Sequence, residues 1–194
     1  MPSSVSINKN DIRVSPSEAA QRLCVPLNFE NEIIERCSAE LYRAVEPKYY
    51  CVEFDIDTSK DSVVDFGFAR FGSADLHKNL KACKKAFIFA VTLGLGVDRL
   101  VTTAKISSPS RAFVLDALAS ATAEAAADCV SAHLREKFSL RPRFSPGYGD
   151  FDLGAQRDIL NVLNADKILG IKLGSNLLMT PKKTITAVQG VENE

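Results

Sequence analysis

The stretch Tyr50-Cys51-Val52-Glu53-Phe54-Asp55-Ile56 decides the fold class of this chain. Its large apolar side chains fall on every second residue, which is the period of a strand with one buried face. Val63–Phe71 repeats the alternation after the polar turn Asp57–Asp61. The two stretches therefore predict a pair of half-buried antiparallel strands.

Helical patterns flank and separate these strands. Ser15-Pro16 and Ser108-Pro109 are typical helix starts, because proline suits the first helical position. The predicted helices cover about residues 16–23, 29–45, 74–83, 97 onward, 109–138, 152–163 and 166–169. The other predicted strands cover residues 11–14 and 86–92, and a closing hairpin joins 177–179 with 184–188. Hairpin strands scattered among helices indicate an α+β fold, an antiparallel twisted β-sheet with helices interspersed.

Length and charge restrict the classes of protein that the chain can belong to. It has 194 residues, 46% of them hydrophobic, with 24 basic and 24 acidic side chains. This length suits one domain over residues 1–194, with the polar residues 1–15 as a loose lead-in. A zero net charge argues against a nucleic-acid partner, because neutralising phosphates requires a basic surplus.

The sequence has no feature of an exported or membrane protein. The N-terminal residues contain no basic segment followed by an apolar one, so no signal peptide is expected. The longest apolar run, Ala86–Val91, is too short to cross a bilayer. We therefore expect a cytoplasmic protein with no membrane partner.

The cysteines and histidines offer little for metal or nucleophilic chemistry. None of the five cysteines forms a CxxC pair, so the expected state is buried, reduced thiols. Cys129 and His133 lie four residues apart on one predicted helix and could meet, but no residue to orient them is evident, which favours a packing role. Gly94-Leu95-Gly96 lacks the third glycine of a dinucleotide-binding loop and is expected to shape a turn. The residues indicate neither an independent catalytic site nor a metal site.

The segment Arg141–Asp150 carries the strongest candidate chemistry. It reads Arg-Pro-Arg-Phe-Ser-Pro-Gly-Tyr-Gly-Asp, so prolines and glycines fix the backbone while arginine and tyrosine side chains project from it. An arginine grips a carboxylate or phosphate in a bidentate way. A tyrosine ring stacks on a base or faces a cation such as a sulfonium. The segment suits either a stiff connector or a site for a zwitterionic, nucleotide-like ligand.

Arg143-Phe144-Ser145-Pro146-Gly147-Tyr148 resembles the RxxPGY motif of the activation domain of cobalamin (vitamin B12)-dependent methionine synthase. Downstream, Gly170-Ile171-Lys172-Leu173 and Leu178-Met179-Thr180-Pro181 are similar to further segments of that family in the same order. Thr184–Ala187 is similar to the family's closing strand, and the match is strongest over residues 141–190. By this resemblance the chain is identified as a small, free-standing member of the activation-domain-like family.

The resemblance implies binding of S-adenosylmethionine and help, in trans, in the reductive reactivation of a cobalamin-dependent methionine synthase or related corrinoid protein. In the family pattern Arg143 binds the methionine carboxylate, the backbone at Ser145 and Gly147 contacts the adenine, and Tyr148 lies near the sulfonium. The sequence has no DxHxxG cobalamin signature and no methyltransferase catalytic domain, so cobalamin would come only through the partner. Flavodoxin or ferredoxin is the implied electron donor.

Two other interpretations stay open. The aromatic pair that follows the last strand in the family has no counterpart in the sequence, which favours a corrinoid-protein docking module that has kept the fold and lost the ligand. The third interpretation is an unrelated small-molecule enzyme on the same scaffold. The family's acidic residue upstream of the motif also lacks a secure counterpart, and Glu136 is the nearest candidate.

Overall fold

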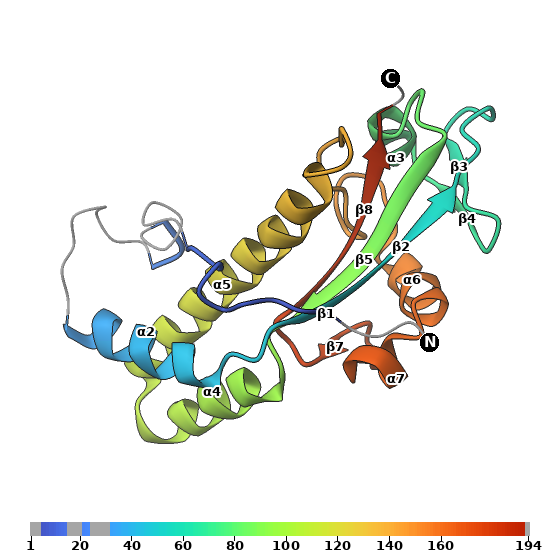
Figure 1. The fold of residues 1–194 in the computed structure, drawn as a ribbon. Coiled ribbons are helices and arrows are strands. Elements are labelled where there is room, and N and C mark those ends of the chain that lie inside the picture. The colour runs from blue at the N-terminus through green and yellow to red at the C-terminus, as the bar shows by residue number, and fades with distance from the viewer. Residues whose placement is uncertain (1–4, 15–20, 24–31, 193–194) are drawn as a thin grey trace.

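The computed structural model describes residues 5–14, 21–23 and 32–192, and a four-stranded antiparallel sheet in the order β1-β2-β5-β8 forms its centre (Figure 1). The strands of this sheet are β1 (Val5–Ser6), β2 (Lys48–Asp55), β5 (Lys85–Thr92) and β8 (Thr184–Val191). Two small hairpins pair β3 (Val63–Asp65) with β4 (Arg70–Gly72) and β6 (Lys172–Leu173) with β7 (Met179–Thr180). The predicted α+β class is confirmed.

β5 lies in the middle of the sheet because it is apolar on both faces. Its residues from Ala86 to Thr92 are all buried, and it pairs along its whole length with β2 on one side and β8 on the other. An uninterrupted apolar run is the pattern of a strand covered on both sides. The hydroxyl of Thr184 donates to the Thr92 hydroxyl at 2.9 Å, which fixes the start of β8 against the end of β5.

The two faces of the sheet are covered by different layers (Figure 1). One face packs against α2 (Glu32–Ala44), α4 (Leu95–Ser107) and α5 (Pro109–Arg135). The other face packs against the β3–β4 hairpin, α3 (Ala74–Asn79), a 3-10 turn (Leu153–Ala155), α6 (Gln156–Val162) and α7 (Ala165–Leu169). α5 has 27 residues and so spans about 40 Å, and its buried alanines let it lie close to its neighbours.

Capping side chains begin three of the helical segments where the sequence predicts them. Ser73 accepts a hydrogen bond from the backbone of Leu76, and Ser108 is followed by proline at the first position of α5. Asp152 accepts from the backbone of Gly154 at the start of the 3-10 turn. Of the helix expected over 16–23, only the helical residues 21–23 lie in the described part of the chain.

The single strand predicted over Val63–Phe71 is wrong, because the segment folds back on itself as β3 and β4. Gly67 turns the chain with φ +78°, and the Asp65 carboxylate fixes this turn by accepting from the Gly67 backbone at 2.8 Å and from Arg70 at 2.6 Å. A single bridge, between Asp57 and Asp65, links the hairpin to the chain after β2.

Two further strand predictions are also wrong. Met179–Thr180 pairs with Lys172–Leu173 and not with β8, which joins the central sheet instead. Near the N-terminus the strand is Val5–Ser6, whose backbone extends the sheet beyond β2, and residues 11–14 form no strand. Among the described helices none is both long and apolar enough to cross a membrane.

Candidate functional site

The candidate loop begins as an added edge on the central sheet. The backbone of Phe144 exchanges two hydrogen bonds with Val188 of β8, at 2.9 and 2.8 Å, and Arg141 N–H donates to the carbonyl of Gly190 at 2.9 Å. Pro146 lies two residues after Phe144, at the position where the next backbone hydrogen-bonded pair with β8 would form. Proline has no N–H to donate, so the chain leaves the sheet there and turns.

The turn itself is tight and internally bonded. Gly147 takes φ +91°, and its N–H donates to the carbonyl of Phe151 at 2.7 Å. The N–H of Tyr148 donates to the carbonyl of Ser145 at 3.1 Å. The backbone is therefore fixed by its own hydrogen bonds, with Pro146 buried beneath it and Tyr148 left 53% exposed.

Aromatic packing supports Tyr148 from one side. Its ring meets Phe144 edge-on with 6.3 Å between centroids, and Phe144 in turn stacks on the buried Phe151 at 6.2 Å. An edge-to-face contact of this kind orients the Tyr148 ring, which stays exposed at the surface. Tyr148 is therefore a supported aromatic platform at the surface of the protein.

Arg143 points from the loop toward α5 and meets two carboxylates there. Its Nη2 lies 2.7 Å from Oδ1 of Asp128 and 3.5 Å from Oε2 of Glu124. The Arg143 side chain is 21% exposed, whereas that of Asp128 is 69% exposed. The site thus places a guanidinium next to two carboxylates at an accessible edge, a combination that matches the carboxylate and ammonium of a free amino acid.

A second basic side chain pairs with the same face of α5, further toward its N-terminus. Nζ of Lys183 contacts Oδ1 of Asp116 at 3.0 Å and the hydroxyl of Ser120 at 2.8 Å. Asp116, Glu124 and Asp128 were expected to form a solvated face because they lie four or eight residues apart. Asp116 and Asp128 are indeed largely exposed, and two basic residues outside the helices and strands, Arg143 and Lys183, pair with this face.

Glu124 and Asp128 are the site residues that sequence reasoning missed. Their shared face was visible in the spacing, but their partner lies 15 to 19 positions away and is brought near by the fold alone. Glu136, the nearest candidate by sequence, instead lies 3.8 Å from His133 at the end of α5.

The Cys129–His133 pair does not form a nucleophile and its base. The thiol of Cys129 donates to the backbone carbonyl of Asp11 at 3.3 Å, and burial raises the pKa of this thiol. The ring of His133 makes a T-shaped contact with the ring of Tyr49, with 6.5 Å between centroids. Because the thiol stays protonated and bonds to a backbone carbonyl, the packing interpretation fits this geometry.

The glycines of Gly94-Leu95-Gly96 serve close packing. A Cβ on Gly96 would lie 2.6 Å from the carbonyl oxygen of Ala44, so only glycine lets α4 approach the end of α2. Among the described cysteines, Cys37 and Cys83 are buried and all four thiols are free, while Cys24 lies outside the described residues. In the described part of the chain no cluster of potential metal ligands occurs.

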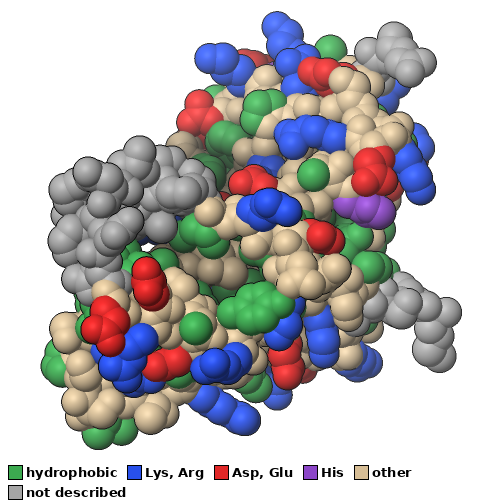
Figure 2. Space-filling view, turned by 60° about the vertical axis from the view of Figure 1, so that its left-hand side comes forward, with side chains coloured by type: hydrophobic (Ala, Val, Ile, Leu, Met, Phe, Trp, Pro, Cys, Tyr) green, Lys and Arg blue, Asp and Glu red, His purple; other side chains and the backbone are tan. Residues whose placement is uncertain are grey.

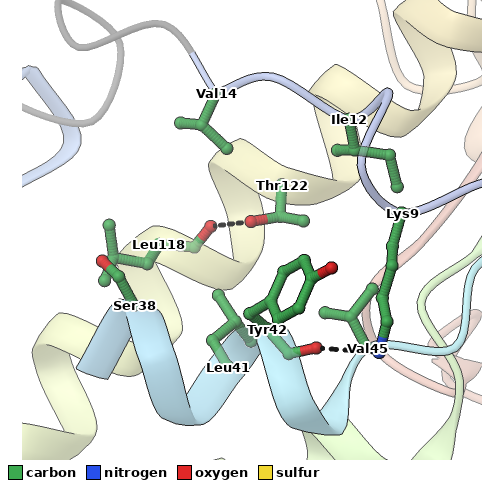
Figure 3. Close-up of a pocket in the computed structure, with 9 residues that line it drawn as sticks. All are labelled: Lys9, Ile12, Val14, Ser38, Leu41, Tyr42, Val45, Leu118 and Thr122. Carbon is green, nitrogen blue, oxygen red and sulfur yellow. Dashed lines mark hydrogen bonds between the residues drawn. The ribbon is translucent and has the colours of Figure 1, made fainter. Parts of the chain in front are cut away.

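A separate apolar cavity of about 260 Å³ lies between α2, α5 and the segment Lys9–Val14 (Figure 3). Two of its polar side chains bond within the protein: Lys9 donates to the carbonyl of Tyr42, and Thr122 to that of Leu118. The cavity lining therefore does not present the guanidinium and carboxylates that the loop of Arg143 presents. On the surface as a whole, Figure 2 shows basic and acidic side chains interspersed over the face it draws.

Comparison with solved structures identifies the fold. The chain is similar to a crystal structure described as the MetH reactivation domain bound to AdoHcy, with a TM-score of 0.74 and 15% sequence identity. The similarity covers 98% of this chain and 78% of that one. The chain has an activation-domain-like fold. This confirms the fold implied by the motif around Arg143, although no family model and no curated protein matches the sequence.

Proposed function

We propose that this protein is an S-adenosylmethionine-binding accessory protein of a cobalamin-dependent enzyme. The observation that carries the proposal is the Arg143 guanidinium beside the carboxylates of Asp128 and Glu124, in the same loop that exposes the ring of Tyr148. The fold supports it, because the similar MetH reactivation domain is bound to AdoHcy.

In this proposal the amino-acid end of the ligand lies against α5. The ligand's carboxylate pairs with the guanidinium of Arg143, and its ammonium pairs with the carboxylates of Asp128 and Glu124, so each charge of the ligand contacts an opposite charge of the protein. The adenine lies along the fixed backbone at Ser145 and Gly147. The ring of Tyr148 then faces the sulfonium, which a π face attracts as it does other cations.

The chain's own residues bind and orient the ligand, and the methyl transfer takes place elsewhere. The partner is a cobalamin-dependent methionine synthase or a related corrinoid protein. Its cobalamin would supply the redox and methyl-accepting chemistry, with flavodoxin or ferredoxin as the electron donor and AdoHcy as the product left from S-adenosylmethionine. The protein acts in the cytoplasm as a single domain and has no catalytic residue of its own in this scheme.

Calorimetry with three ligands tests the proposal. S-adenosylmethionine and AdoHcy carry the amino-acid end, whereas 5′-methylthioadenosine lacks it. Arg143→Ala should weaken the binding of S-adenosylmethionine and of AdoHcy by about 30-fold, since charged hydrogen bonds contribute about 1.5–3 kcal/mol. The affinity for 5′-methylthioadenosine should stay unchanged. Arg157→Ala, which removes an exposed arginine from α6, is the matched control. Absence of binding by the unmodified protein at millimolar ligand would refute the proposal.

The docking alternative is supported by a different observation. Tyr148 and the neighbouring Leu153 are both exposed large hydrophobic side chains, and Leu153 lies against Gly147 of the loop. Such a pair suits a contact with another protein whether or not a ligand is bound. A complex with a corrinoid protein that forms equally well with and without S-adenosylmethionine would favour this alternative.

A further inference from the structure

The end of the candidate loop is latched to a segment that lies 75 positions earlier in the chain. The carboxylate of Asp150 accepts hydrogen bonds from the hydroxyl of Ser73, from the backbone of Ala74 at 2.8 Å and from the backbone of Asp75 at 3.1 Å. The bond is reciprocal, because the N–H of Asp150 donates to Oδ2 of Asp75 at 3.2 Å. The donors to the carboxylate, Ser73 foremost, hold the pKa of Asp150 below its usual range.

The close approach of the two segments depends on Gly149. This glycine takes φ +52°, and a Cβ on it would lie 2.2 Å from Oδ2 and 3.2 Å from Cβ of Asp75. Any side chain at this position would push the carboxylate of Asp75 away from the Asp150 N–H. Gly149 directly follows Tyr148, so the latch acts on the backbone next to the aromatic platform.

The segment that receives the latch is itself firmly held. Ser73 is buried and its backbone N–H donates to the carbonyl of Ser62, which ties it to the β3–β4 hairpin. The amide of Asn79, at the other end of α3, donates to the carbonyl of Pro142 at the start of the loop. α3 therefore holds the loop at both ends, with Arg143 and Tyr148 between the two contacts.

We propose that Asp150 is a positioning residue that fixes Tyr148 for ligand binding through its latch to Ser73 and Asp75. The inference rests on the proposed function for the identity of the ligand, but the latch acts on the loop whether or not a ligand is present. Pre-ordering a contact residue raises affinity because the cost of ordering it is met before the ligand arrives. Loss of the latch should therefore weaken binding without removing any atom that touches the ligand.

The test uses the fact that the chain contains no tryptophan. In a Tyr148→Trp reporter protein the single indole reports the mobility of the loop by its fluorescence anisotropy. Asp150→Ala and Gly149→Ala should each lower that anisotropy in the absence of ligand. Gly170→Ala is the control for backbone strain, since Gly170 has φ +70° with open space around it and lies outside the loop, and it should leave the anisotropy unchanged.

Binding is measured in proteins that keep Tyr148, with AdoHcy as the probe. Asp150→Ala and Gly149→Ala should raise the Kd about tenfold, while their urea midpoints match that of Gly170→Ala. The Kd of Asp150→Asn for AdoHcy should lie between the values of these variants and that of the unmodified protein, because the amide oxygen can still accept a hydrogen bond from the backbone of Ala74. If Asp150→Ala fails to fold, Asp150→Asn and Gly149→Ala still decide the question.

The outcomes separate the latch from the proposed function. Unchanged anisotropy in both Asp150→Ala and Gly149→Ala would overturn the inference, and so would lowered anisotropy with an unchanged Kd. If the anisotropy falls but even the unmodified protein does not bind AdoHcy, the ligand assignment fails, and with it the role of Asp150 in binding, while the mechanical latch stands.

Discussion

Asp128 on α5 and Arg143 on the loop form a direct ion pair, with 2.7 Å between Oδ1 and Nη2. Under the proposed function this pair orients the guanidinium before the ligand arrives, and the carboxylate of Asp128 then pairs with the ligand's ammonium. Asp128→Ala should therefore weaken AdoHcy binding about fivefold, a modest loss because the carboxylate of Asp128 is largely exposed. Asp116→Ala, on the same face of α5 but paired with Lys183, should leave AdoHcy binding unchanged.

Tyr148 should contribute through its ring and not through its hydroxyl. Tyr148→Phe is expected to bind AdoHcy within about twofold of the unmodified protein, whereas Tyr148→Ala should lose about tenfold, the usual cost of a lost stacking platform. Calorimetry on both variants makes the comparison. Equal losses in the two variants would mean that the hydroxyl, and not the ring, contacts the ligand.

Gly96 should be required for the packing of α4 against α2. Gly96→Ala places a Cβ 2.6 Å from the backbone oxygen of Ala44, and overpacking of this kind costs about 1–3 kcal/mol of unfolding free energy. Gly72→Ala is the matched control, because no atom lies within 4 Å of its added Cβ, and it should change stability by less than about 0.5 kcal/mol. Urea unfolding curves distinguish the two.

Cys51 should make the protein less stable at alkaline pH. Burial, aided by the charge of Glu53, raises the pKa of its thiol from 9.0 to about 12. A raised folded-state pKa stabilises the protein fully below the unfolded value, and this contribution is lost as the pH rises from about 9 toward 12. The urea midpoint of Cys51→Ala should therefore fall less between pH 8 and pH 10.5 than that of the unmodified protein. Parallel declines would contradict the assignment.

Local sequence features predicted the helix starts and the central strand well. Ser73, Ser108 and Asp152 cap where they were expected to, because a cap is decided by residues within one turn. The apolar run of β5 needs no partner to be recognised as a buried strand. The loop around Pro146 was likewise predicted to be stiff, since proline and glycine restrict the backbone wherever they occur.

Strand pairing was predicted less well, because it depends on residues distant in the sequence. The turn at Gly67 does have a local sequence signal, an aspartate two residues before a glycine. The alternation of apolar and polar residues across the same segment favoured one continuous strand and hid this signal. The separation of β7 from β8 had no such signal, because the residues that pair with β8 lie 92 to 106 positions earlier. The pairing of Arg143 with Glu124 and Asp128 belongs to the same class of long-range contact.

The backbone bonds of the loop to β8 also bear on how the protein behaves at high concentration. Phe144 and Arg141 occupy hydrogen-bonding groups of β8 at Val188 and Gly190, and at the opposite edge the described residues of β1 are Val5 and Ser6. An exposed strand edge is a template on which other chains can add and start an aggregate. The loop that presents Tyr148 thus also blunts one edge of the sheet, so substitutions that detach it should promote self-association as well as weaken binding.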